Sequence, residues 1–246
     1  MQRYFIKLSY NGTPFNGWQI QPDAPTVQQE LEDAISKIFQ SKTGVLGCGR
    51  TDSGVHASEF FAHFETEETF EEESLAFKLN CMISNEIAIE KIVKVAEELH
   101  ARFSATARTY HYYINQKKNA FRFNESWFMH SKLDVVLMNE ACQFLIGKQD
   151  FTSFSKLHTQ TRTNICTITE AYWSANNGNL KFTITADRFL HNMVRAIVGT
   201  TISVGKGRMN PDEIKTIIAA KSRQKAGASV PAQGLFLARI KYPQEI

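Results

Sequence analysis

The pattern of apolar and polar positions predicts strands and helices in a regular order along the first hundred residues. Apolar residues at every second position indicate a strand, and apolar residues three and four apart indicate a helix. On this basis we expect, in chain order, a strand at 3–10, a helix at 27–39, strands near 44–48 and 59–65, a helix near 74–82 and a strand near 88–96. Thr26, with Gln29 three residues later, has the spacing of an N-cap for the first helix.

The remainder of the chain repeats this order. We expect a strand at 109–114, a helix near 134–146, strands near 165–174 and 179–186, a helix near 190–204, a short helix after Pro211 and a last strand at 235–241. Two runs of strand–helix–strand–strand–helix–strand are typical of ferredoxin-like units. We therefore predict an α+β fold of two such halves, residues 1–105 and 106–246. A largely antiparallel mixed sheet flanked by helices would leave an active-site cleft between the halves.

Composition narrows the class of protein. A chain of 246 residues with 43% hydrophobic content can bury a sizeable core. No secretory-type leader and no apolar run of the roughly 18 residues needed for a membrane span is visible, which predicts a cytoplasmic protein. The four cysteines lie far apart without a CxxC pair, so we expect free thiols rather than disulfides or a zinc site.

The charge is distributed unevenly. Residues 1–100 hold 8 Lys and Arg against 16 Asp and Glu, a balance of −8. Residues 101–246 hold 20 against 9, a balance of +11. A basic half with interspersed aromatic residues suits a polyanion, because Lys and Arg displace the counterions condensed on phosphates. An ordinary solvated surface is the alternative interpretation.

The segment 47–57, GCGRTDSGVHA, is the strongest candidate for chemistry. It places Asp52 in a glycine-flanked turn between two predicted strands, where a reacting group is held by rigid elements and exposed to a ligand. Asp52 is a candidate nucleophile or general base, and the alternative is a turn aspartate that bonds its own backbone. Arg50, two residues earlier, is a candidate to hold a phosphate or to fill the gap left by a displaced base, and the alternative is an ordinary surface arginine.

Arg195 lies in an apolar predicted helix, where an unpaired charge is expensive. A carboxylate opposite it would meet that need and would itself stay ionised, although a structural ion pair or a snorkelling arginine is equally compatible with the sequence. The spacing also predicts that His191 shares a helix face with Arg195. Tyr110, in a predicted strand, is a candidate for stacking on a base, and core packing is the alternative.

Six blocks together resemble the TruA family of tRNA pseudouridine synthases, in order and over nearly the whole chain. They are YNGTPFNGWQIQP at 10–22, GCGRTDSGVHA at 47–57, ARFSATARTYHYYI at 101–114, FTSF at 151–154, FLHNMVRAIVGT at 189–200 and GLFLARI at 234–240. The resemblance implies a cytoplasmic isomerase (an intramolecular transferase) that converts uridine to pseudouridine at positions 38, 39 and 40 of the tRNA anticodon stem-loop. It also implies a homodimer that uses no metal or organic cofactor.

The resemblance also assigns roles to four residues. Asp52 is the expected catalytic residue, Tyr110 the tyrosine that stacks on uracil, Arg195 the partner of the aspartate, and Arg50 an RNA contact near the extruded nucleotide. Two positions depart from the usual family pattern: Ser53 stands where alanine is commoner, and Thr109 where a basic residue is frequent. From the residues alone, a carboxylate-nucleophile hydrolase and an RNA-binding module without catalysis are the alternative functions.

Overall fold

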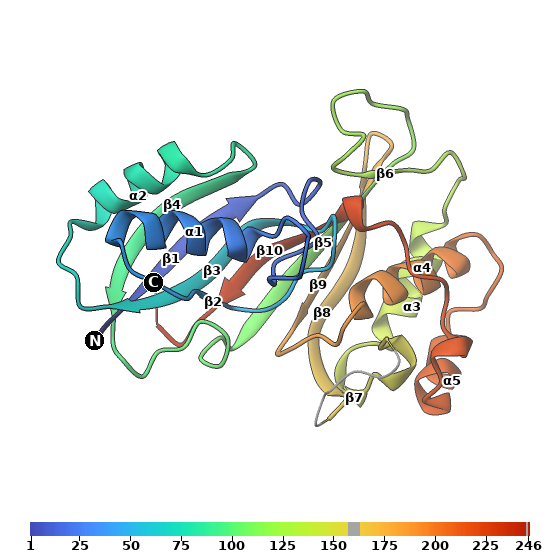
Figure 1. The fold of residues 1–246 in the computed structure, drawn as a ribbon. Coiled ribbons are helices and arrows are strands. Elements are labelled where there is room, and N and C mark those ends of the chain that lie inside the picture. Colours follow the sequence, from blue (N-terminus) through green and yellow to red (C-terminus); the bar gives the residue numbers. More distant parts are fainter. Residues whose placement is uncertain (157–162, 245) are drawn as a thin grey trace. The chain divides into compact units, whose positions relative to one another are not determined.

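The computed structural model describes residues 1–156, 163–244 and 246 (Figure 1). The chain forms two compact units, Met1–Thr106 with Phe236–Ile246, and Ala107–Leu235. The change of unit after Thr106 lies next to the boundary expected from the sequence. The last strand, expected within the second half, clusters with the first unit.

The first unit is an α+β unit with a mixed sheet. Its elements are β1 (Gln2–Tyr10), α1 (Val27–Phe39), β2 (Leu46–Gly47), β3 (His56–Thr66), α2 (Glu72–Met82), β4 (Ile87–Val95) and β10 (Leu235–Lys241). The strand order is β4-β1-β3-β10, and β2 also pairs with β3. All pairs are antiparallel except β10, which runs parallel to β3 through Phe236–His56 and Leu237–Ala57. The order β4-β1-β3-β2 is that of a ferredoxin-like unit.

Side-chain alternation in β1 fills both faces of this sheet. Tyr4 stacks on Phe64 with ring centroids 5.6 Å apart, on the face where Phe39 of α1 also contacts Phe64. The next residue, Phe5, points to the other face and meets Tyr242 edge-on at 5.6 Å. The C-terminal segment after β10 therefore completes the core of the first unit.

Helix α1 begins where the sequence predicts. Thr26 is extended (φ −137°), and its hydroxyl accepts a hydrogen bond from the backbone N–H of Gln29 at 3.3 Å. The Gln29 side chain bonds Asp33 instead of reaching back to the cap, so only half of a capping box forms. Val27, Leu31 and Ile35 are buried, as their spacing requires.

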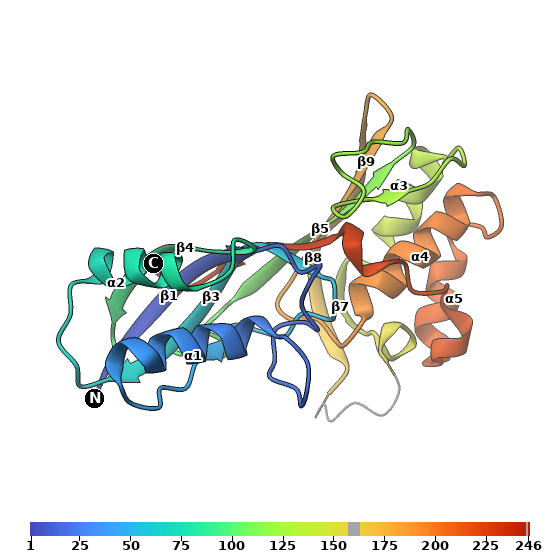
Figure 2. The same cartoon turned by 45° about the horizontal axis from the view of Figure 1, so that its top comes forward.

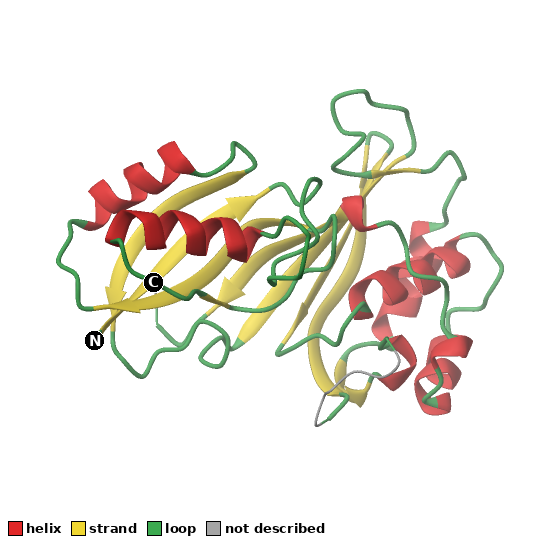
Figure 3. Cartoon of the chain, viewed as in Figure 1, coloured by secondary structure: helices red, strands yellow, loops and turns green. Residues whose placement is uncertain are grey.

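The second unit has the same class of fold. Its elements are β5 (Ala107–Asn115), β6 (Trp127–Phe128), α3 (Val135–Gln143), β7 (Gly147–Asp150), β8 (Ile165–Asn176), β9 (Asn179–Ala186), α4 (Met193–Gly205), α5 (Glu213–Ala220) and short 3-10 turns. The antiparallel order is β5-β9-β8-β7, with β6 parallel to β5. Figure 3 shows strands and helices interspersed through the chain. The predicted α+β class, with largely antiparallel strands flanked by helices, is confirmed.

Two local predictions were wrong, and two short strands were not predicted. The expected helix at 190–204 begins only at Met193, because Asn192 takes a left-handed conformation (φ 65°) that interrupts the helical backbone. His191 therefore precedes α4 and does not share a helix face with Arg195. Strands β6 and β7 were not expected, since one is a two-residue pairing and the other is the polar sequence GKQD.

Candidate active site

The loop that carries Asp52 connects β2 to β3 and begins and ends in backbone hydrogen bonds. The N–H of Cys48 bonds the Phe61 carbonyl in β3 at 2.7 Å. The N–H of Val55 bonds the Asp52 carbonyl at 3.1 Å and closes a turn around the aspartate. The Asp52 side chain is half-buried, whereas Arg50 is exposed. Asp52 and Arg50 therefore lie in one loop of the first unit, with different access to solvent.

A second loop, residues 11–18, fixes the backbone on both sides of Asp52. Trp18 donates its N–H to the Thr51 carbonyl at 3.3 Å, and Gly54 donates to the Phe15 carbonyl at 3.2 Å. Gly17 has φ 89°, and a Cβ there would lie 2.3 Å from the Thr51 carbonyl oxygen. Only glycine permits this approach. The loop that holds Asp52 is therefore supported by a segment about 35 residues earlier in the chain.

Aromatic packing anchors the supporting loop in turn. The Tyr10 hydroxyl lies 2.9 Å from Thr51 Oγ1, and the Trp18 ring stacks on Phe60 with centroids 4.2 Å apart. Trp18 is also buried against Gly47, where a Cβ would lie 2.5 Å from the indole. The family block at 10–22 thus has a structural role next to the loop that carries Asp52.

The two departures from the family pattern fit their surroundings. The Ser53 hydroxyl donates to the Phe15 carbonyl at 3.4 Å and approaches Asn16 Oδ1 at 3.3 Å. The Thr109 and Thr185 hydroxyls are 2.9 Å apart across β5 and β9. Both residues therefore find hydrogen-bond partners within their own unit.

Tyr110 lies in β5 of the second unit, opposite Ile184 in β9. Its ring meets Phe189 edge-on, with centroids 5.1 Å apart and planes at 86°. The side chain is only half-buried. A half-buried aromatic ring of this kind can offer a face to a ligand.

Arg195 is half-buried in α4 and is tied to the segment before β10. Its Nε donates to the Val230 carbonyl at 2.7 Å, and the Val230 N–H bonds the Arg195 carbonyl at 3.3 Å. The Tyr112 hydroxyl donates to the next carbonyl, that of Pro231, at 2.9 Å. Burial raises the pKa of Tyr112 well above its usual value, against a smaller opposing effect of the Arg195 charge, so this hydroxyl stays protonated. The bond from Nε to the Val230 carbonyl thus orients the Arg195 guanidinium.

Sequence reasoning missed the residues that hold the segment 226–230 against α4. A Cβ on Gly199 would lie 1.8 Å from the Ala228 carbonyl oxygen, so the two backbones touch. The Thr200 hydroxyl accepts from the Gly227 N–H at 2.8 Å. This contact places the Val230 carbonyl against Arg195. The only signal in the sequence was the presence of glycine at positions 199 and 227, and nothing in the sequence links these two positions.

We expect Gly199→Ala to destabilise the protein by about 3 kcal/mol, because the new methyl group overlaps backbone that must shift as a unit. Chemical denaturation measures the free energy of unfolding. Gly44→Ala is the matched control, since a Cβ there has no atom within 4 Å. Equal stabilities of the two variants would contradict the proposed contact.

Arg223 and Asn192 also hold the segment 226–230 of the second unit in place. Arg223 donates to the Gly227 carbonyl at 3.0 Å and to the Ser229 hydroxyl at 2.9 Å. Asn192 Nδ2 also bonds the Ser229 hydroxyl. The left-handed residue that delays the start of α4 therefore helps to hold the segment that orients Arg195.

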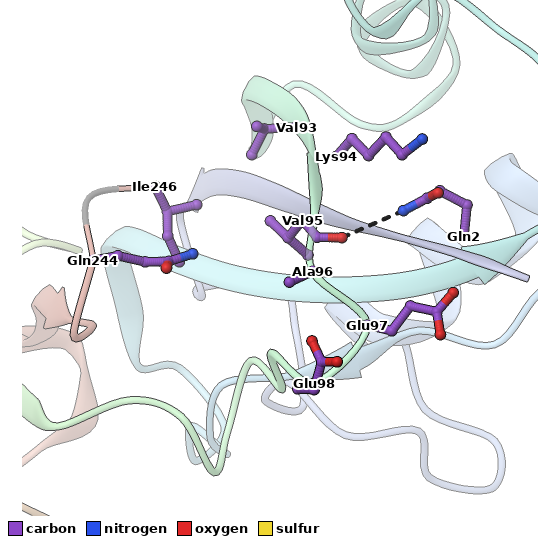
Figure 4. A pocket seen from close by; sticks show the side chains of 9 residues that line it. All are labelled: Gln2, Val93, Lys94, Val95, Ala96, Glu97, Glu98, Gln244 and Ile246. Atoms are coloured by element: carbon purple, nitrogen blue, oxygen red, sulfur yellow. Dashed lines mark hydrogen bonds between the residues drawn. The ribbon is translucent and has the colours of Figure 1, made fainter.

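A surface hollow in the first unit lies apart from these residues. Gln2 Nε2 bonds the Val95 carbonyl at 3.4 Å at its edge (Figure 4). Its lining consists of Gln2, Val93, Lys94, Val95, Ala96, Glu97, Glu98, Gln244 and Ile246. None of the four predicted site residues belongs to this lining, so the hollow is not part of the candidate site.

A metal site and a membrane-spanning helix would each need a specific arrangement of the described residues. Among them, no three or more His, Cys, Asp or Glu side chains gather in a group that could hold a metal ion. Within the same ranges, none of the helices has the length and apolar character needed to cross a membrane.

Comparison with known proteins identifies the family. A family model described as tRNA pseudouridine synthase matches residues 141–243. The tRNA pseudouridine synthase A of Parabacteroides distasonis is 50% identical over 100% of this chain and 98% of its own length. The chain belongs to the tRNA pseudouridine synthase A family. The relative from Bacteroides fragilis is 48% identical over 100% of this chain and 98% of its own, and that from Bacillus subtilis 39% over 96% and 97%.

Membership makes this chain an enzyme of the isomerase class, and the resemblance inferred from the six blocks is confirmed. The four predicted site residues are distributed over both units of this family member. Arg50 and Asp52 lie in the first unit, and Tyr110 and Arg195 in the second. The pairing of Asp52 with Arg195 stays a prediction.

Proposed function

We propose that this chain isomerises uridine to pseudouridine at positions 38, 39 and 40 of the tRNA anticodon stem-loop, with Asp52 as the catalytic nucleophile or base. The observation that carries the proposal is the Asp52 turn, which a neighbouring loop fixes from both sides while Asp52 itself is only half-buried. The relatives' name, tRNA pseudouridine synthase A, supplies the substrate and the reaction class.

The reaction accounts for the types of residue in the proposed site. The bond between uracil N1 and ribose C1′ breaks, the ring turns, and C5 bonds to C1′. The C5 hydrogen leaves as a proton and N1 gains one, so the reaction needs no oxidant or reductant. Asp52 either attacks the nucleoside covalently or removes a sugar proton, and both routes require its ionised form.

The other residues have binding and positioning roles in this proposal. Tyr110 stacks on the detached uracil and keeps it in place while it turns. Arg195, oriented by the Val230 carbonyl, pairs with the Asp52 carboxylate. Arg50, exposed two residues before Asp52, contacts the RNA where the nucleotide leaves the stack.

The proposal extends to the assembly and the location of the enzyme. Extruding a base costs a few kcal/mol, which phosphate contacts from the basic residues after position 100 offset. We propose a homodimer in which one tRNA contacts both subunits. Since tRNA is the substrate, the enzyme acts in the cytoplasm.

Release of tritium tests this function directly. The protein is incubated with an unmodified tRNA transcript that carries tritium at uracil C5. Isomerisation at three uridines releases up to three tritium atoms per transcript. Binding of the transcript without release would contradict the proposed activity and favour an RNA-binding module.

A further inference from the structure

The segment 116–126, which we call the β5–β6 loop, presents aromatic and cationic side chains to solvent. Phe121 is 94% exposed and Phe123 is 66% exposed. The cationic side chains of the loop are exposed as well, and they are Lys117, Lys118 and Arg122. The loop has one carboxylate, Glu125, so its net charge is +2. Exposed apolar side chains that are concentrated in one segment often mark a binding site.

Hydrogen bonds within the loop fix its conformation. Asn119 Oδ1 accepts from the Phe121 N–H at 2.9 Å, which forms a turn directly before the most exposed ring. The Ser126 hydroxyl donates to the Arg122 carbonyl at 2.7 Å and accepts from Asn115 Nδ2 at 2.7 Å. Asn115 and Ser126 are both buried and close the base of the loop.

The loop is also attached to its neighbours in the second unit. Gln116 donates its N–H to the Gly178 carbonyl, at the tip of the β8–β9 hairpin, at 2.9 Å. Gln233 Nε2 donates to the Phe123 carbonyl at 3.3 Å. Figures 1 and 2 both show the loop beside this hairpin tip. The exposed rings are therefore presented by a fixed backbone and not by a loose tail.

The combination of charge and exposed rings decides the class of partner. An apolar patch for another protein would favour few like charges near its centre. Here Arg122 separates Phe121 from Phe123, and two lysines precede them. Cations that meet phosphates, with aromatic rings on which bases stack, are the arrangement that binds unpaired nucleic acid.

We propose that the β5–β6 loop is an RNA-binding arm. Phe121 stacks on an unpaired base of the tRNA, and Lys117, Lys118 and Arg122 contact the flanking phosphates. This proposal depends on the proposed function in one respect, which is the identification of the bound RNA as tRNA. It adds substrate contacts distinct from those of Arg50, Asp52, Tyr110 and Arg195.

Equilibrium binding of an unmodified tRNA transcript at fixed salt tests the arm. We expect Phe121→Ala to raise Kd roughly ten-fold, because stacking on one base is lost. Phe121→Tyr keeps an aromatic face and should bind within two-fold of the wild type, whereas Phe121→Leu should resemble alanine. The control is Phe77→Ala, which removes a 70% exposed ring from α2 and should leave Kd unchanged.

Salt dependence tests the cationic part of the proposal. For the double variant Lys117→Ala/Lys118→Ala, we expect the slope of log Kd against log salt to fall by roughly one for each phosphate that the variant no longer neutralises. An unchanged slope would show that these lysines do not bind the RNA. Thermal denaturation should give wild-type midpoints for all of these variants, since their side chains are exposed.

Three results would overturn the arm. The first is a Kd for Phe121→Ala within two-fold of the wild type. The second is equal binding by the leucine and tyrosine variants, which would indicate an apolar contact instead of stacking. The third is a change of sedimentation mass in Phe121→Ala, which would make the loop a contact between two copies of this chain. Failure of the proposed function is separate, because wild-type protein would then bind tRNA and release no tritium.

Discussion

We expect Asp52→Ala to lower the single-turnover rate of tritium release from tRNA by at least ~10⁴-fold. Removing a nucleophile or base that acts on the reacting atoms typically costs an enzyme this much. The dissociation constant for the transcript stays within a few-fold of the wild type, because phosphate contacts dominate RNA affinity. The loss should therefore appear in the rate and not in binding.

Ser53→Ala is the matched control for this variant. Ser53 shares the turn with Asp52, but its hydroxyl contacts Phe15 and Asn16 at the long distances of 3.4 and 3.3 Å. Its rate should remain within a few-fold of the wild type. A rate for Asp52→Ala within ten-fold of the wild type would remove Asp52 from the mechanism.

Arg195→Met has the second largest expected effect, a loss of roughly 10²- to 10³-fold in the single-turnover rate. In the proposed pairing, removal of Arg195 leaves the Asp52 charge uncompensated, at a cost of about 3–4 kcal/mol. Arg195 also donates Nε to the Val230 carbonyl, so displacement of that segment contributes to the loss as well. The measurement therefore combines the rate with thermal denaturation.

The variant Arg195→Lys separates the effect of the positive charge from that of the hydrogen bond to the Val230 carbonyl. A lysine keeps the positive charge but does not reproduce the Nε bond together with a second contact. We expect it to recover at least ten-fold of the rate lost by the methionine variant. Equal rates of the two variants would assign Arg195 a structural role only, and a methionine variant with full activity would refute the pairing with Asp52.

Local patterns were sufficient for most of the elements, because side-chain periodicity is set by neighbours in the chain. The helix from Val27 to Phe39 and its Thr26 cap follow from spacing and cap chemistry alone. The start of α4 did not follow, since the left-handed conformation of Asn192 is held by tertiary contacts such as its bond to Ser229. Strand β10 joins β3 through Phe236 and His56, which are remote in the sequence.

The candidate site shows the same division between local and distant information. The motif around Asp52 could be read directly, but its support by Gly17 and Trp18 depends on a backbone approach that only coordinates reveal. Arg195 could be singled out as a charge in an apolar helix. The contact between Gly199 and Ala228, which presents Val230 to it, could not.

The most direct test of the central claim compares two tRNA transcripts labelled with tritium at uracil C5. One carries uridine at positions 38, 39 and 40, and the other carries cytidine there and the same labelled uridines elsewhere. We predict that the wild-type protein releases the label of the three positions from the first transcript and none from the second. Equal release from both transcripts, or none from either, would contradict the account.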